Sequence, residues 1–122
     1  MGIFKRLQNF FTRSGREDNL MRQGMEHASA NQPAKAIEVY DALVSSQTTS
    51  PTMRSRALFN RALAYSSMKD DEKAIADLEQ VVGMPGVPEN VLTAARTQLI
   101  RVRNRGDRNR ARADRVKSHE AG

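Results

Sequence analysis

Two neighbouring stretches decide the fold of this chain: ALFNRALAY at residues 57–65 and DDEKAIADLEQVV at residues 70–82. The second stretch has apolar residues at 74, 75, 78, 81 and 82, which form one stripe along a helix of 3.6 residues per turn. In the first stretch the small residue Ala62 lies four positions after Leu58 and three before Tyr65. A small residue there lets a second helix approach closely. The two stretches therefore predict a pair of packed helices.

The same pattern occurs earlier in the chain, at an offset of 38 residues. Residues 35–44 align with 73–82, residues 20–27 align with 58–65, and Gly24 stands at the small-residue position. Regular self-similarity of this kind is typical of repeat architectures, so the sequence predicts an internal duplication.

Residues that favour the start of a helix, together with one polar loop, mark the boundaries of the helices and of the two repeats. Pro33, Ser50-Pro51 and Asp70-Asp71-Glu72 are residues that favour the first turn or the N-cap of a helix, and the polar residues 46–52 predict a connecting loop. A last helix is expected from Pro88-Glu89, with an apolar stripe of Leu92, Ala95, Leu99 and Val102. Because a repeat stack needs a terminal cover for its last apolar face, this helix is predicted to be a cap.

These residues resemble the tetratricopeptide repeat family. The resemblance is close over residues 57–78 and more degenerate over 20–44, where Gly24, Ala36, Ile37 and Tyr40 occupy the signature places. The sequence departs from the family pattern with histidine at 27, leucine at 20 and 58, and a displaced closing proline near residues 85–88. The resemblance implies an all-α fold, a short tetratricopeptide-type helical-hairpin solenoid with a C-terminal capping helix.

The expected organisation has three parts, and the formal net charge of +6 is divided among them unevenly. They are a basic amphipathic helix at 1–16, a repeat module at 17–104 and a basic polar tail at 105–122. The module divides into repeat one at about 17–46, repeat two at about 52–84 and the capping helix at about 88–104. A mildly acidic body between two basic arms is the pattern of arms that meet an anionic partner.

The sequence predicts neither an enzyme nor a metal or cofactor site. It has no cysteine, His27 stands where the repeats carry a packed ring, and His119 lies in the polar tail. The acidic residues 70–72 are explained by capping of a helix start. No apolar run approaches the roughly 20 residues that cross a bilayer, so we expect a cytoplasmic protein, with peripheral membrane attachment as the alternative.

The resemblance places the binding surface on the concave face, which the first helix of each repeat lines. Its residues are Met21, Met25, Arg56, Phe59, Asn60, Leu63 and Arg101. Some family members clamp carboxylate tails there with lysines and asparagines; only Asn60 matches, so no carboxylate clamp is expected. A groove rich in methionine suits an apolar or amphipathic helix, which predicts a non-catalytic scaffold or adaptor for a protein or peptide partner. Core packing of Met21 and Phe59 is the alternative for those two.

The N-terminal segment has an apolar face consisting of Ile3, Phe4, Leu7, Phe10 and Phe11. Three interpretations stay open: this face packs on the chain's own repeats, lies in an anionic membrane interface through residues 1–14, or docks on a partner.

The C-terminal arm has arginines spaced four, three, four and three residues apart, at Arg101, Arg105, Arg108, Arg112 and Arg115. A helix continuing through Gly106 would align them toward a polyanion, but like charges and glycine oppose that helix. Residues 106–122 are therefore expected to be frayed or disordered alone and to gain helix on an anionic surface; a merely solvated tail is the alternative.

The runner-up function is a peripheral membrane or nucleic-acid-associated protein acting through both arms. The sequence leaves the oligomeric state open.

Overall fold

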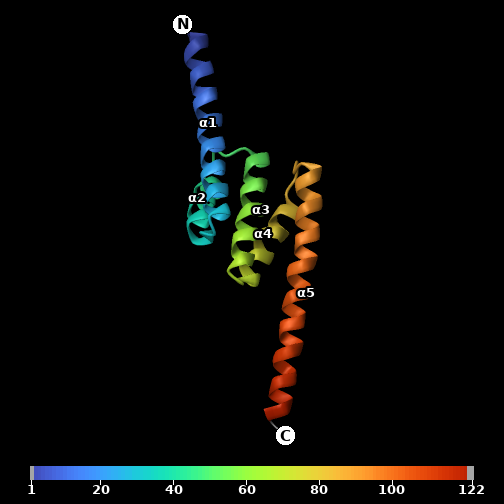
Figure 1. Ribbon diagram of the computed structural model, residues 1–122. Helices are drawn as coiled ribbons and strands as arrows, with labels where there is room; N and C mark the ends of the chain where they lie inside the picture. Colours follow the sequence, from blue (N-terminus) through green and yellow to red (C-terminus); the bar gives the residue numbers. More distant parts are fainter. Residues whose placement is uncertain (1, 121–122) are drawn as a thin grey trace.

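The computed structural model describes residues 2–120, which form five helices and, within that range, no strand. Side chains are described for residues 15–119. In chain order the helices are α1 (Gly2–Ser29), α2 (Pro33–Ser45), α3 (Pro51–Ser67), α4 (Asp71–Gly83) and α5 (Glu89–Glu120). Successive helices pack side by side, and the outer ends of α1 and α5 project in opposite directions (Figure 1). The fold is all-α, as predicted.

The helix boundaries repeat at the offset of 38 residues that the sequence predicts. Helices α1 and α3 end at Ser29 and Ser67, and α2 and α4 span Pro33–Ser45 and Asp71–Gly83. The start of α5, at Glu89, likewise lies one offset after the start of α3, at Pro51. The duplication therefore extends from the sequence to these helix boundaries, whereas the start of α1, at Gly2, lies earlier than the offset predicts.

The turn inside each hairpin is also the same. Asn31 and Lys69, which correspond by the offset, have φ values of 59° and 62°, in the left-handed region. In the residue that follows each of them, the backbone N–H donates to the carbonyl five positions back: Gln32 to His27 and Asp70 to Tyr65, both at 2.9 Å. This is the long hydrogen bond of a Schellman motif, which closes the end of a helix.

Replacing Lys69 with glycine should stabilise the protein. A non-glycine residue pays about 1 kcal/mol or more in the left-handed region, whereas glycine adopts it freely. We expect Lys69→Gly to raise the free energy of unfolding by about 0.5–1 kcal/mol, measured by urea denaturation. Asn31→Gly should gain less, since asparagine tolerates this conformation better than lysine. A loss of stability in Lys69→Gly would contradict this explanation of the turn.

The core consists of two clusters that adjoin at Val44. The first lies between α1, α2 and α3 and contains Met21, Ala36, Tyr40, Leu43, Met53 and Ala57. The second joins α3, α4 and α5 and contains Leu58, Ala62, Ala74, Leu78, Val81, Val91, Ala95, Leu99 and Val102. Helix α5 thus covers the last apolar face, as a cap does. Val91, at the position equivalent to the buried Met53, is buried in place of the predicted Leu92, which is half-buried.

Gly24 lies where α1 approaches α2 closely, against the ring of Tyr40. A Cβ atom placed on it would lie 2.8 Å from both Cδ1 and Cζ of Tyr40, well inside van der Waals contact. Tyr40 is 1% exposed, and this burial raises the pKa of its hydroxyl. The ring thus fills the space that a side chain at residue 24 would need, and the predicted role of the small residue is confirmed.

An alanine at residue 24 should destabilise the fold, whereas an alanine at residue 106 should stabilise it. Gly24→Ala forces the Tyr40 ring or the α1 backbone to move, an overpacking effect that costs about 1–3 kcal/mol. Gly106 lies inside α5, and no atom lies within 4 Å of the place that a Cβ would take, so Gly106→Ala should gain about 0.5–1 kcal/mol of helix stability. Thermal unfolding of both variants tests this, and a melting temperature of Gly24→Ala equal to or above that of the wild type would contradict the close packing at Gly24.

Two helices continue beyond the ends that the sequence predicts. The capping helix does not stop near residue 104: α5 runs to Glu120, through Gly106. No proline interrupts this stretch, and the spaced acid Asp107 pairs with Arg110 at 3.1 Å, which offsets part of the repulsion among cations. Likewise α1 passes through residues 16 and 17 without a break, and its first half extends beyond the repeats (Figure 1). The apolar face predicted at residues 3–11 lies outside the range of described side chains, which begins at residue 15.

Candidate functional site

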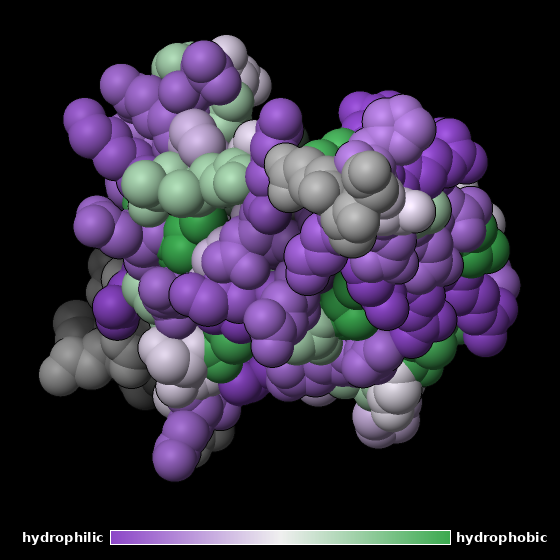
Figure 2. Space-filling model, turned by 90° about the horizontal axis from the view of Figure 1, so that it is seen from below, coloured by the Kyte–Doolittle hydropathy of each residue, from purple (hydrophilic) through white to green (hydrophobic). Residues whose placement is uncertain are grey.

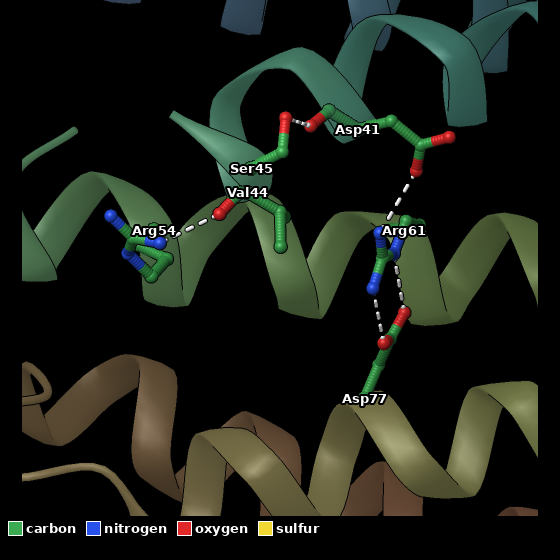
Figure 3. Close-up of polar contacts among 6 residues, drawn as sticks. All are labelled: Asp41, Val44, Ser45, Arg54, Arg61 and Asp77. Atoms are coloured by element: carbon green, nitrogen blue, oxygen red, sulfur yellow. Dashed lines mark hydrogen bonds and ion pairs between the residues drawn. The ribbon is translucent and has the colours of Figure 1, made fainter. Parts of the chain in front are cut away.

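A single arginine, Arg61, sets the position of α3 against both of its neighbours. Its Nε and Nη2 atoms donate to the two carboxylate oxygens of Asp77 on α4, at 2.8 and 2.7 Å. Its Nη1 atom donates to Asp41 on α2, at 2.8 Å (Figure 3). One guanidinium group therefore joins three consecutive helices across the boundary between the two repeats.

The pair of Arg61 and Asp77 is largely removed from water, whereas the side chain of Asp41 is 51% exposed. Asp77 is 5% exposed and the side chain of Arg61 is 18% exposed. The hydrogen bond with Asp77 raises the pKa of Arg61 above its ordinary value, and burial opposes that shift only in part. Arg61 also lies over the ring of Tyr65, 5.8 Å from its centroid. The guanidinium is thus permanently charged and held by a bidentate partner, which is the strongest geometry for such a pair.

A second arginine fixes the loop between the repeats. Arg54 of α3 donates to the backbone oxygens of Val44 and Ser46, at 2.6 and 2.7 Å, and so caps the end of α2 (Figure 3). The hydroxyl of Ser50 accepts a hydrogen bond from the N–H of Met53, at 3.2 Å, and begins α3 as predicted. These contacts place the first turn of α3, including Met53, against α1 and α2.

Removing Asp77 should cost far more stability than removing an exposed partner of equivalent chemistry. Asp77→Ala leaves a largely buried guanidinium with one partner instead of two, and we expect a loss of about 3 kcal/mol in the free energy of unfolding. The matched control is Glu79→Ala on the same helix, which removes an ion pair with Arg103 whose side chains are 53% and 52% exposed. That control should change stability by no more than about 1 kcal/mol. Equal losses in urea denaturation would contradict the role given to Arg61.

A groove of about 620 Å³ lies between α1 and the beginning of α3. Three methionines form its apolar part: Met21 and Met53, each 9% exposed, and Met25, which is 52% exposed. The other lining residues are Asp18, Arg22, Glu26, Ser29, Ala30 and Arg56. The groove thus has a methionine floor and a charged rim.

A smaller cavity of about 310 Å³ adjoins this groove and shares Met25 with it. Its lining includes Asn60 and Leu63 of α3, and Leu63 is 38% exposed. The amide Nδ2 of Asn60 donates to the sulfur of Met21 at 3.3 Å, so Asn60 supports the floor of the larger groove. Together the two cavities make a continuous surface along α1 and α3.

The structure brings together most, but not all, of the predicted groove residues. Met21, Met25 and Arg56 line the larger cavity, and Met25, Asn60 and Leu63 line the smaller one. Phe59 instead packs against the cluster that α5 completes, and Arg101 is exposed on α5; neither lines these cavities. Met53, which sequence reasoning missed, forms part of the floor. Met53 lies before the stretch at residues 57–65 that carries the family resemblance. Its equivalence by the offset to the apolar Val91 is the sequence feature that could have identified it as a packed residue.

The predicted basic arm is divided by a contact with the repeats. Arg105 pairs with Asp71 at the start of α4 and donates to the hydroxyl of Ser66 at 2.9 Å. Arg101, Arg108, Arg112 and Arg115 are exposed. Among the described residues of α5, Arg105 is therefore the last whose side chain forms a hydrogen bond or ion pair with another helix.

His27 has a structural environment. It is half-buried, and its Nδ1 lies 3.0 Å from Oε1 of Gln32, across the turn between α1 and α2. His119 is exposed on α5. Within the part of the chain whose side chains are described, no three histidine, aspartate or glutamate residues are grouped closely enough to hold a metal ion.

Comparison with known proteins finds a family for part of the chain. The family model described as "Tetratricopeptide repeat" matches residues 55–85, which include α3 from Ser55 onward and all of α4. No curated protein and no solved structure matches significantly. Over the described residues, none of the helices combines the length and the apolar character that crossing a membrane requires.

Proposed function

We propose, since residues 55–85 match the tetratricopeptide repeat family, that the chain is a non-catalytic scaffold that binds an amphipathic helix of a protein partner in the groove between α1 and α3. Repeats of this family generally mediate contacts between proteins, which supports a partner of that class. The single observation that carries the proposal is the exposed methionine surface.

The methionine surface has the properties of a binding site rather than of core. Met25 and Leu63 are among the large apolar residues that the described chain leaves exposed, and both line the adjoining cavities. Methionine side chains are flexible and polarizable, so they adapt to the apolar residues of an incoming helix. Helix-in-groove recognition places residues at i, i+3, i+4 and i+7 of the ligand on such a surface.

The rim specifies the charges of the partner. Asp18, Arg22 and Glu26 follow one another at intervals of four residues, so they form a row along one edge of α1. All three are exposed, and Arg56 provides a further cation from α3. A helix with a basic, an acidic and a basic residue at the same spacing beside its apolar stripe would complement this row. Because the row is symmetric in charge, it accepts such a helix in either direction.

A displayed library of helix-forming peptides, randomised on one face, tests the proposal. Peptides selected on the wild-type chain should share an apolar stripe and bind Met25→Glu at least about tenfold more weakly, because a carboxylate then lies against apolar side chains. The matched control is Met68→Glu, because Met68 is 50% exposed on the C-cap of α3 and lines neither cavity. Its affinities should equal those of the wild type.

Two results would overturn the proposal. One is a selection that enriches no peptide with an apolar stripe. The other is a set of peptides whose affinity falls equally in Met25→Glu and Met68→Glu. Equal melting temperatures for the two variants, which both replace an exposed side chain, show that a difference in affinity arises at the groove.

A further inference from the structure

The second half of α5 is a helix without support from the repeats. Arg105 is its last anchor, and the side chains from Asp107 to His119 are all exposed. In Figure 1 this half projects beyond the other helices. A helix of this length is marginal in water when nothing packs on it. A binding partner that neutralises its charge would therefore stabilise it.

One face of this free half is a row of cations. Arg108, Arg112 and Arg115 follow at intervals of four and three residues, which places them on one side of the helix over about 10 Å at 1.5 Å per residue. The acids Asp107 and Asp114 each lie one position before an arginine of the row, about 100° around the helix. Asp107 pairs with Arg110 rather than with the row. Within the range whose side chains are described, no ion pair neutralises these three arginines.

We propose that this row binds the phosphate backbone of double-stranded DNA, with α5 lying along or in the major groove. Guanidinium groups match phosphate oxygens in a bidentate manner, and all three cations of the row are arginines. An α-helix fits the major groove of B-form DNA, whereas the deep major groove of double-stranded RNA is too narrow. The bases need not be read, so the binding is independent of sequence.

Other anionic partners fit this helix less well. Insertion into a membrane interface needs a broad apolar face, but the free half offers only Val116 and alanines, and the end of the molecule seen in Figure 2 is mostly hydrophilic. Single strands are held largely by stacking on aromatic rings, and α5 contains no phenylalanine, tyrosine or tryptophan. The inference is independent of the proposed groove, which lies between α1 and α3.

Fluorescence anisotropy of the full chain with a short labelled DNA duplex tests the proposal. The row variant Arg112→Gln/Arg115→Gln is compared with Arg110→Gln/Lys117→Gln, which removes the same charge from exposed positions outside the row. Each phosphate contact contributes about −0.9 to the slope of log affinity against log salt, so the row variant should flatten that slope by about 1.8. The control should leave it unchanged. Circular dichroism checks that both variants keep the helix content of the wild type.

Several results would overturn the inference. The first is that the wild-type chain does not bind the duplex at about 50 mM salt, where phosphate contacts are strong. The second is an equal change of slope in both variants, which would mean that net charge rather than the row determines binding. The third is binding to duplex RNA, phosphatidylserine vesicles or polyglutamate as tight as to DNA and equally dependent on the row.

Discussion

The arrangement of the repeats depends on the contact between Arg61 and Asp77. Apolar packing alone permits helices to slide and rotate against one another, since it has no direction, whereas a bidentate ion pair fixes both distance and angle. Arg61 adds Asp41 at 2.8 Å, so the same group aligns α3 with α2 as well as with α4. The groove between α1 and α3 inherits this alignment, because α2 packs against both of these helices. A contact whose residues do not line the methionine surface therefore helps to position the helices that form it.

The helices could be predicted because their sequence features lie close together along the chain. The ion pair between Arg61 and Asp77 could not, because no such feature marks it. Caps, prolines and apolar stripes are each recognised within a few residues of sequence. Because the pattern repeats at an offset of 38 residues, the helices predicted for one hairpin could also be assigned to the other. The positions equivalent to Arg61 and Asp77 in repeat one are Gln23 and Val39, so self-comparison gives no hint of the pair. Contacts between residues far apart in sequence leave no periodic trace unless both repeats carry them.

The same equivalence explains why the cavities include the groove residues predicted on α1 but only some of those predicted on α3. Met21 and Phe59 correspond by the offset, and each lies on the first helix of its hairpin. Met21 faces the α1 and α3 groove, which nothing fills in the described part of the chain, whereas Phe59 packs against the cluster that α5 completes. The concave face that the family resemblance implies includes both Met21 and Phe59. It does not take into account α5, which packs against Phe59 and not against Met21.

The capping helix becomes an arm because two positions of the repeat have changed their chemistry. Gly24 and Ala62 admit the second helix of each hairpin, and the equivalent residue of α5 is Ile100, which is 60% exposed. At the turn, Asn31 and Lys69 take the left-handed conformation, whereas the equivalent Asp107 stays helical. With a large side chain in place of the small one and no reversal at the turn, α5 continues straight to Glu120, and within the described residues no later helix folds back on it. Each hairpin needs the small residue and the left-handed turn. Because α5 lacks both, it continues as a straight, cationic helix.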